Sequence, residues 1–407
     1  MMFQKKVELV EYQSVMLPED SLSYELGKFI WENYSSQVTI DFPSPKTDGQ
    51  WRLQNLGWVG YIPVSNEFLI FLKPKVPLEN IFRMLEYAYN LKSIHFFSDQ
   101  VQCDSLQDFF NILAGILARR ILNRGRKGFY KAYRDEYERL PYICGRIDLN
   151  QQLKTPWTVK FLCHYQECTQ NIVDNQILLW TLYVIKSSGL CVEETLHLIN
   201  RAFRSLRKAV DLRPFDPQQC YKRSYNRLNL DYQPLHNLCW FFLEHCGPQF
   251  TMGEQAMIPF MVNMAFLYEL FVAQWLKVHL PEGLELREQE RVDIDESSML
   301  YFIVDLVIYE KDSDKVIYVL DTKYKVSDSI SPSDFSQVTT YALAKDCREA
   351  ILIYPGEMNS QSGGLIQNIR VRSMSFPLEG DIEKAGRRFL KDLLGVEPET
   401  GKTPVSG

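Results

Sequence analysis

Residues 301–325 read YFIVDLVIYEKDSDKVIYVLDTKYK, and this stretch decides the fold of the C-terminal part of the chain. Apolar residues dominate 301–310 and 315–320, and the polar run KDSDK joins the two segments. Short apolar runs rich in Val, Ile and Tyr that flank a polar turn are typical of two antiparallel strands. The stretch therefore predicts a β-hairpin.

The hairpin brings three ionisable side chains together. Side chains alternate between the two faces of a strand, so Asp321 and Lys323 share one face. If the turn closes around residues 312–314, antiparallel pairing sets Glu310 opposite Lys315 and places Asp305 beside residue 320 or 321. We therefore expect Asp305, Asp321 and Lys323 to converge.

Such a group needs a compensating positive charge. Neighbouring carboxylates repel each other, and a carboxylate among Ile, Val and Tyr side chains loses favourable hydration. Mg²⁺ suits a few carboxylates combined with water and a substrate phosphate, and Mn²⁺ is the alternative ion. We expect Asp305 and Asp321 to hold the metal for phosphoryl chemistry, with Lys323 near the attacking water or the developing charge. The alternative is a structural ion pair between Asp305 and Lys323, with Asp321 beginning a turn.

Three further side chains flank the hairpin in sequence. Glu269 lies on a strongly apolar helix that precedes the strands, where it either adds a carboxylate to the metal site or is exposed on a polar stripe. Gln337 and Tyr341 are four residues apart on the following helix and share one face. They either orient the metal ligands or grip DNA, or they are an ordinary exposed Gln and a core Tyr.

The whole chain reads as a mixed α/β (α+β) protein. We expect a β-rich N-terminal domain over 1–77, a mostly helical region over 78–250, a third domain over 251–395 and a flexible tail over 396–407. In the third domain the patterns run helix, three strands, helix, two strands, helix, which contains an αβββαβ core. A long helix is expected over 257–280.

Composition indicates an ordinary folded protein with a weak intrinsic affinity for DNA. Hydrophobic residues make up 46% of the chain and charged residues 24%. The net charge of −6 counts against an autonomous DNA binder. Nine cysteines without a C-x-x-C pair argue against a zinc site. No secretory signal or membrane span is visible, so we expect a cytoplasmic protein.

The run from Glu269 through VDLVIYE, LDTKYK and SDFSQVTTYA resembles the PD-(D/E)xK nuclease superfamily, and its Q-x-x-x-Y helix is similar to the RecB-like branch. The resemblance implies a metal-dependent nuclease in which Asp305, Asp321, Lys323 and Glu269 are catalytic. The metal ligands would be Asp305, Asp321, Glu269 and the backbone carbonyl of Thr322, with Gln337 and Tyr341 in support. Val304 stands where the family name has proline.

Further segments resemble the McrC family of McrBC-type restriction systems. They are WRLQNLGWVGYIPV, FLKPKVPLENIFRMLEYAY, YERLPYICGRIDL and CHYQECTQNIVDNQILLWTL, in this order along the chain. The family implies an endonuclease subunit that cleaves DNA with modified cytosine, such as 5-methylcytosine. It also implies a double-stranded DNA substrate and a GTP-hydrolysing AAA+ partner, McrB-like, whose GTPase the N-terminal region stimulates. With these resemblances, residues 78–250 are expected to bind the partner and residues 251–395 to form the PD-(D/E)xK nuclease domain.

Two other functions stay open at this stage. A non-catalytic adaptor that activates an AAA+ motor would keep a degenerate nuclease fold, but the D…DxK pattern is intact. A stand-alone RecB-like repair nuclease would cut DNA without GTP. The chain has no G-x-x-x-x-G-K-[ST] motif, so any nucleotide hydrolysis is expected from another polypeptide.

Overall fold

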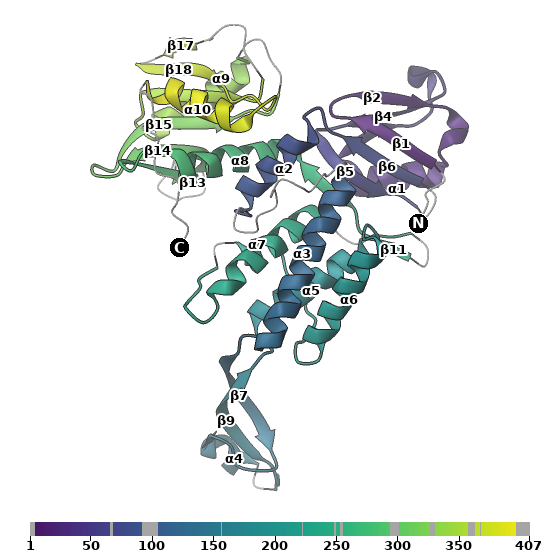
Figure 1. Cartoon of the computed structure of the whole chain (residues 1–407), viewed down its shortest axis with the longest axis vertical. Helices are drawn as coiled ribbons and strands as arrows, with labels where there is room; N and C mark the ends of the chain where they lie inside the picture. The colour runs from purple at the N-terminus through teal and green to yellow at the C-terminus, as the bar shows by residue number, and fades with distance from the viewer. Residues whose placement is uncertain are drawn as a thin grey trace. The chain divides into compact units, whose positions relative to one another are not determined.

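Figure 1 shows the computed structural model of the chain, which describes residues 5–65, 68–91, 105–155, 157–221, 223–247, 250–252, 255–293, 301–325, 330–356, 363–366 and 368–395. They form two compact units. The first combines Met1–Asp104 with Met261–Gly407, and the second is Ser105–Phe260. The sequence predicts consecutive domains, whereas the structure packs both ends of the chain into one unit. The predicted tail, 396–407, lies outside the described residues.

The N-terminal part of the first unit is rich in β-strands. These strands are β1 (Lys5–Val10), β2 (Ser14–Leu17), β3 (Val38–Asp41), β4 (Trp51–Asn55), β5 (Trp58–Pro63), β6 (Phe68–Lys73) and β12 (Phe260–Asn263). One sheet has the order β1-β6-β5-β12, with β1 and β6 parallel, and a second, antiparallel sheet has the order β2-β4-β3.

Helix α1 (Tyr24–Tyr34) is an element of this part that the alternating sequence pattern does not predict. The Ser23 side chain caps the helix by accepting a hydrogen bond from the Leu26 amide at 3.3 Å. Ile30 and Tyr34, four residues apart, are buried on its inner face. The N-terminal part is thus β-rich but not purely β.

The C-terminal part of the same unit is built on one six-stranded sheet with helices. Its elements are α8 (Met264–His279), β13 (Leu284–Asp293), β14 (Tyr301–Glu310), β15 (Lys315–Thr322), α9 (Pro332–Ala344), β16 (Glu349–Tyr354), β17 (Gly363–Ile366), β18 (Ile369–Ser375) and α10 (Ile382–Leu394). The strand order is β13-β14-β15-β16-β18-β17. Strands β13 to β15 pair antiparallel, and β15, β16 and β18 pair parallel. The predicted succession αβββαβ is present, and β17 is an additional strand that pairs with β18.

The prediction of one long helix over 257–280 is wrong for the residues before Met264. Helix α8 begins only at Met264, and the residues before it include strand β12. The Asn263 side chain accepts hydrogen bonds from the amides of Ala265 and Phe266 at 3.0 and 3.1 Å. This cap fixes the start of the helix, because it satisfies amides that lack a partner within the first turn.

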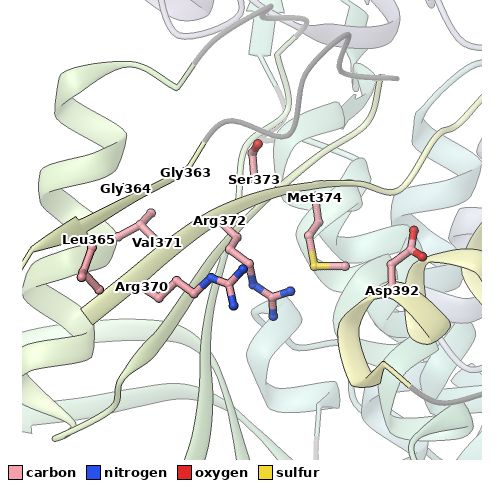
Figure 2. A pocket seen from close by; sticks show the side chains of 9 residues that line it. All are labelled: Gly363, Gly364, Leu365, Arg370, Val371, Arg372, Ser373, Met374 and Asp392. Atoms are coloured by element: carbon pink, nitrogen blue, oxygen red, sulfur yellow. The ribbon is translucent and has the colours of Figure 1, made fainter. Parts of the chain in front are cut away.

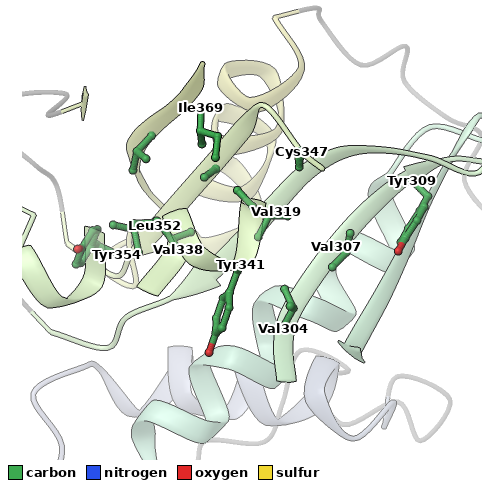
Figure 3. Close-up of a cluster of buried hydrophobic side chains, with 13 residues drawn as sticks. Val304, Val307, Tyr309, Val319, Val338, Tyr341, Cys347, Leu352, Tyr354 and Ile369 are labelled. Atoms are coloured by element: carbon green, nitrogen blue, oxygen red, sulfur yellow. The ribbon is translucent and has the colours of Figure 1, made fainter. Parts of the chain in front are cut away.

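The core of this sheet is continuous on the side that α9 covers. Val304, Val319 and Ala350 of three neighbouring strands pack with Val338 and Tyr341 of α9, and all are buried (Figure 3). Elsewhere in the unit, Phe376 stacks on Phe389 of α10 and contacts Trp275 of α8 edge to face. Helix α9 thus packs on the sheet, and Phe376, which follows β18, contacts both α8 and α10.

Helix α2 (Leu78–Ala88) follows β6 and joins the two parts of the first unit. The buried Asn80 donates hydrogen bonds to the carbonyls of Leu378 and Gly380 at 2.8 and 3.0 Å. The Tyr87 hydroxyl donates to Glu383 at the start of α10 at 2.5 Å.

The second unit is mostly helical, as the sequence predicts. Its elements are α3 (Leu106–Lys127), β7 (Ala132–Leu140), β8 (Arg146–Ile147), α4 (Leu149–Lys154), β9 (Phe161–Thr169), α5 (Val173–Ser187), α6 (Glu193–Arg207), α7 (Gln233–His245), β10 (Phe250–Met252) and β11 (Gln255–Met257). Strands β7 and β9 form a nine-residue antiparallel ladder that extends beyond the helices of this unit (Figure 1). The sequence run LPYICGRIDLNQQL, residues 140–153, predicts only a short extended segment here, and it does not predict this long hairpin.

Among the described helices, none is both long and apolar enough to cross a membrane.

Candidate active site

The hairpin of β14 and β15 has the predicted register. Glu310 pairs with Lys315, and Leu306 pairs with Leu320 across the two strands. The next position on each strand is Asp305 and Asp321, so the two carboxylates lie on adjacent strands at the end of the described ladder. One irregularity, between Ile308 and Tyr309, does not separate them.

Asp321 is a fully buried acid, with 0% of its surface exposed. The Lys323 ammonium nitrogen lies 2.8 Å from Asp321 Oδ2. Within the described part of the chain, however, neither carboxylate oxygen of Asp321 has a hydrogen bond of regular geometry. Burial raises the pKa of Asp321 to about 7, and the neighbouring Asp305 adds to this rise while Lys323 opposes it. The ion pair therefore compensates only part of the cost of burying the charge.

The pKa of Asp305 is raised as well. Burial, together with the negative charge of Glu269, raises this pKa to about 6. Asp321 is fully buried and Asp305 is half-buried, and the ionised form of each is disfavoured. Two such adjacent carboxylates, with the Asp321 oxygens lacking regular hydrogen bonds among the described residues, are a donor set that fits a divalent cation. Thr322, which follows Asp321, is half-buried at the end of β15.

Lys323 is held by a chain of hydrogen bonds from helix α9. Its ammonium group donates to Gln337 Oε1 at 3.0 Å, and Gln337 Nε2 donates to the Tyr341 hydroxyl at 2.9 Å. Burial alone would lower the pKa of Lys323, but the ion pair with Asp321 outweighs it and the pKa is raised. Lys323 forms its ion pair with Asp321, and Asp321 lies within strand β15. The alternative prediction, an ion pair between Asp305 and Lys323 with Asp321 beginning a turn, is therefore wrong.

Glu269 lies near this group without forming a three-carboxylate cluster with it. Gln289 donates a hydrogen bond to Glu269 Oε1 at 2.5 Å. Burial raises the pKa of Glu269, and the charge of Asp321 contributes. Among the described residues, no group of three His, Cys, Asp or Glu side chains is arranged to hold a metal ion. The structure thus brings Asp305, Asp321 and Lys323 together and leaves Glu269 beside them, engaged by Gln289.

The sequence pattern does not predict several residues that contact the candidate site. Gln289 reaches Glu269 from β13, at a residue with a φ of 52°, which the strand pattern gives no reason to expect. Lys325 forms an ion pair with Asp334 at the first turn of α9, and the Tyr354 hydroxyl donates to Asp334 at 3.3 Å. The run SPSD was a usable signal, because Ser331 caps α9 through the Asp334 amide at 3.2 Å.

A pocket of about 580 Å³ lies elsewhere in the C-terminal part, between the β17–β18 edge and α10 (Figure 2). Arg370, Arg372 and Asp392 line it, and Arg372 Nε is 3.2 Å from Glu349. It has no adjacent pair of carboxylates, so its chemistry does not suit a catalytic metal. The hairpin group remains the candidate active site.

Magnesium is expected to bind more tightly as pH rises. Because their pKa values are raised, Asp305 and Asp321 hold protons in mildly acidic solution that a metal ion must displace. Without metal, the free energy of unfolding should fall as the pH rises from 3.8, the ordinary aspartate pKa, to about 7. The reason is that the buried Asp321 must lose its proton in the folded state over this range. We therefore expect Mg²⁺ to raise the melting temperature more at about pH 8 than at about pH 5.5.

Differential scanning fluorimetry of the metal-free protein, with and without Mg²⁺, measures this difference. Asp321→Asn should remove most of the Mg²⁺ effect at the higher pH, whereas Asp312→Asn, in the turn of the same hairpin, should retain it. An equal Mg²⁺ effect at both pH values, or one that survives Asp321→Asn, would contradict the assignment.

Comparison with known proteins identifies the family. A family model described as McrBC 5-methylcytosine restriction system component matches residues 53–355. Among curated proteins, no sequence matches this chain. A solved structure with a similar fold is a refined half-complex from the tetradecameric assembly of Thermococcus gammatolerans McrB AAA+ hexamers with bound McrC. It matches at 14% identity and a TM-score of 0.53, over 96% of this chain and 100% of that chain.

The cryo-EM structure of the Thermococcus gammatolerans McrBC complex also matches, at 15% identity and a TM-score of 0.43, over 70% of this chain and 90% of that chain. The family model itself spans well over half of the present sequence. The chain therefore belongs to the McrBC family of 5-methylcytosine restriction system components.

Proposed function

We propose that this chain is the Mg²⁺-dependent endonuclease subunit of a two-component restriction system, of the PD-(D/E)xK type, that cleaves DNA containing modified cytosine. One observation carries the proposal. Asp321 is fully buried, the half-buried Asp305 lies beside it on the adjacent strand, and Lys323 lies 2.8 Å from Asp321. Placing a half-buried acid beside a fully buried one is costly without a metal ion, so a purely structural role would not favour this arrangement.

In this proposal Asp305, Asp321 and the Thr322 carbonyl hold the ion, and Glu269 supports them from its neighbouring position. The bound ion would polarise the scissile phosphate and lower the pKa of a coordinated water. Lys323 stays protonated at neutral pH because its pKa is raised. It can therefore donate hydrogen bonds to the phosphate oxygens as negative charge develops. Gln337 and Tyr341 fix the direction of the Lys323 ammonium group.

We also propose that an McrB-like, GTP-hydrolysing AAA+ protein delivers double-stranded DNA to this subunit. Membership of the McrBC family supports such a partner, and the structure of similar fold contains McrB AAA+ hexamers with bound McrC. The net charge of −6 is consistent with DNA that is held mainly by another protein. The absence of a phosphate-binding loop motif from the sequence assigns GTP hydrolysis to the partner.

The second unit offers a surface for this partner. Exposed apolar side chains gather on the segment between β7 and β9, which we call the hairpin tip and define by Leu149, Leu153, Trp157 and Val159. Trp157 is 79% exposed and Val159 is 88% exposed. Exposed apolar side chains that gather in one patch are typical of protein interaction sites. We therefore propose that the partner-binding function expected for residues 78–250 includes the hairpin tip.

Replacing Asp321 or Lys323 by Ala should lower DNA cleavage by at least about 100-fold, because each change removes a group that stabilises the transition state. Stimulation of the partner's GTPase should persist, since the hairpin tip is unchanged. Cleavage of methylated plasmid and GTP hydrolysis, measured with the purified partner, separate the two activities. Lys311→Ala and Asp312→Asn, in the turn of the same hairpin, are the matched controls and should cut normally. Cleavage that survives in both active-site variants would sink the proposal, and wild-type protein that never cuts with Mg²⁺ would favour an adaptor.

Replacing Leu153 and Trp157 together by Ala should weaken partner binding and GTPase stimulation by about tenfold or more, as loss of exposed anchor residues does at protein interfaces. Leu228→Ala, which removes another exposed leucine of the same unit, serves as the control. Titration of the partner in a GTPase assay gives both affinity and maximal stimulation. Normal titration curves for the double variant would exclude the hairpin tip from the interface.

A further inference from the structure

A partly buried hydrogen bond joins the N-terminal β-rich part of the first unit to the residue that follows Lys323. The Tyr324 hydroxyl donates to Glu11 Oε2 at 3.0 Å, across 313 positions of sequence. Glu11 has no exposed surface, and burial raises its pKa. Breaking a hydrogen bond to a buried acid is costly, because its oxygen then lacks both water and a protein partner.

Glu11 is fixed from the N-terminal side. Its amide donates to the Lys73 carbonyl at 3.1 Å, and its second carboxylate oxygen accepts from the Lys75 amide at 2.9 Å. The following residue, Tyr12, donates its amide to the Asn55 carbonyl at 3.1 Å. Glu11 is therefore a rigid acceptor whose position the N-terminal sheets determine.

Tyr324 is the middle residue of a tight turn at the candidate site. The Lys323 amide donates to the Ile353 carbonyl at 2.8 Å, and the Lys325 amide donates back to the Lys323 carbonyl at 2.9 Å. A hydrogen bond from residue i+2 to residue i closes a three-residue turn, so holding the central side chain restrains both flanking lysines. The Tyr324 ring also contacts Tyr268, the neighbour of Glu269 on α8, with ring centroids 5.9 Å apart.

We propose that Glu11 and Tyr324 are positioning residues, which fix the backbone at Lys323 for catalysis through the hydrogen bond between them. The inference rests on the proposed nuclease function. Lys323 can stabilise developing charge only if its ammonium group stays within hydrogen-bond reach of both Asp321 and the substrate phosphate. A shift of about 1 Å in a catalytic group can lower a rate by about 100-fold. The N-terminal part thus contributes to cleavage without touching the DNA phosphate.

The chain supplies a matched control for this proposal. Tyr87 donates its hydroxyl to Glu383 at 2.5 Å, which is a second tyrosine–glutamate bond between the N-terminal and C-terminal segments. It lies between α2 and the start of α10, on elements that carry none of the candidate catalytic residues. Tyr87→Phe therefore removes the same kind of bond without affecting the turn at Lys323.

Single-turnover cleavage in the presence of the partner and GTP tests the proposal, with Tyr324→Phe, Glu11→Gln and Tyr87→Phe compared. Tyr324→Phe and Glu11→Gln should lower the rate constant by about tenfold or more, because the catalytic lysine loses its restraint. The DNA concentration for half-maximal rate should stay within about twofold of the wild type, since no phosphate contact is lost. The double variant should be no slower than the slower single variant, as expected for two residues that act through one bond.

Hydrogen–deuterium exchange of the metal-free protein gives a readout that is independent of cleavage. Peptides covering residues 320–325 should exchange faster in Tyr324→Phe and Glu11→Gln, and at the wild-type rate in Tyr87→Phe. Wild-type cleavage and exchange in both variants, or an equal loss in Tyr87→Phe, would overturn the proposal. If the wild-type protein does not cleave, the proposed nuclease function fails, whereas the exchange comparison still decides whether the bond restrains the turn.

Discussion

The candidate active site is organised around the fully buried carboxylate of Asp321, which lies inside a strand of the C-terminal sheet. Burial of an ionised carboxylate costs free energy, because the group loses its hydration. The only cation close to this carboxylate in the described structure is Lys323, and the pKa of Asp321 is nevertheless raised to about 7. A protein gains no stability from placing Asp305 next to it. The rest of the site is explained if both acids exist for a ligand that carries positive charge. Gln337 and Tyr341 then serve to hold the Lys323 ammonium group in place beside Asp321.

The surrounding fold supplies the rigidity that such a site needs. Helix α9 fixes Lys323 from one side, and the pair of Asp334 and Lys325 fixes the segment after it. The N-terminal part adds Glu11 as an acceptor for Tyr324. Because both ends of the chain share one compact unit, a β-rich segment distant in sequence takes part in the geometry of the C-terminal sheet.

Sequence reasoning succeeds where local periodicity determines position. The period of two along a strand and the length of the polar turn suffice to place Asp305 beside Asp321, and the helical spacing of Gln337 and Tyr341 suffices to align them. It fails where position depends on remote backbone. The contact of Gln289 with Glu269 depends on a local departure from strand geometry, and the Glu11–Tyr324 bond links residues 313 positions apart. No pattern within either segment records such contacts.

The central claim is that Asp305 and Asp321 form a divalent metal site. Anomalous diffraction from crystals of the protein grown with Mn²⁺ tests it most directly. The account predicts a single strong peak within coordination distance, about 2.0–2.4 Å, of a carboxylate oxygen of each aspartate, with the Thr322 carbonyl as a further ligand. A structure at saturating Mn²⁺ with no peak there, and with the ion pair between Lys323 and Asp321 unchanged, would contradict it.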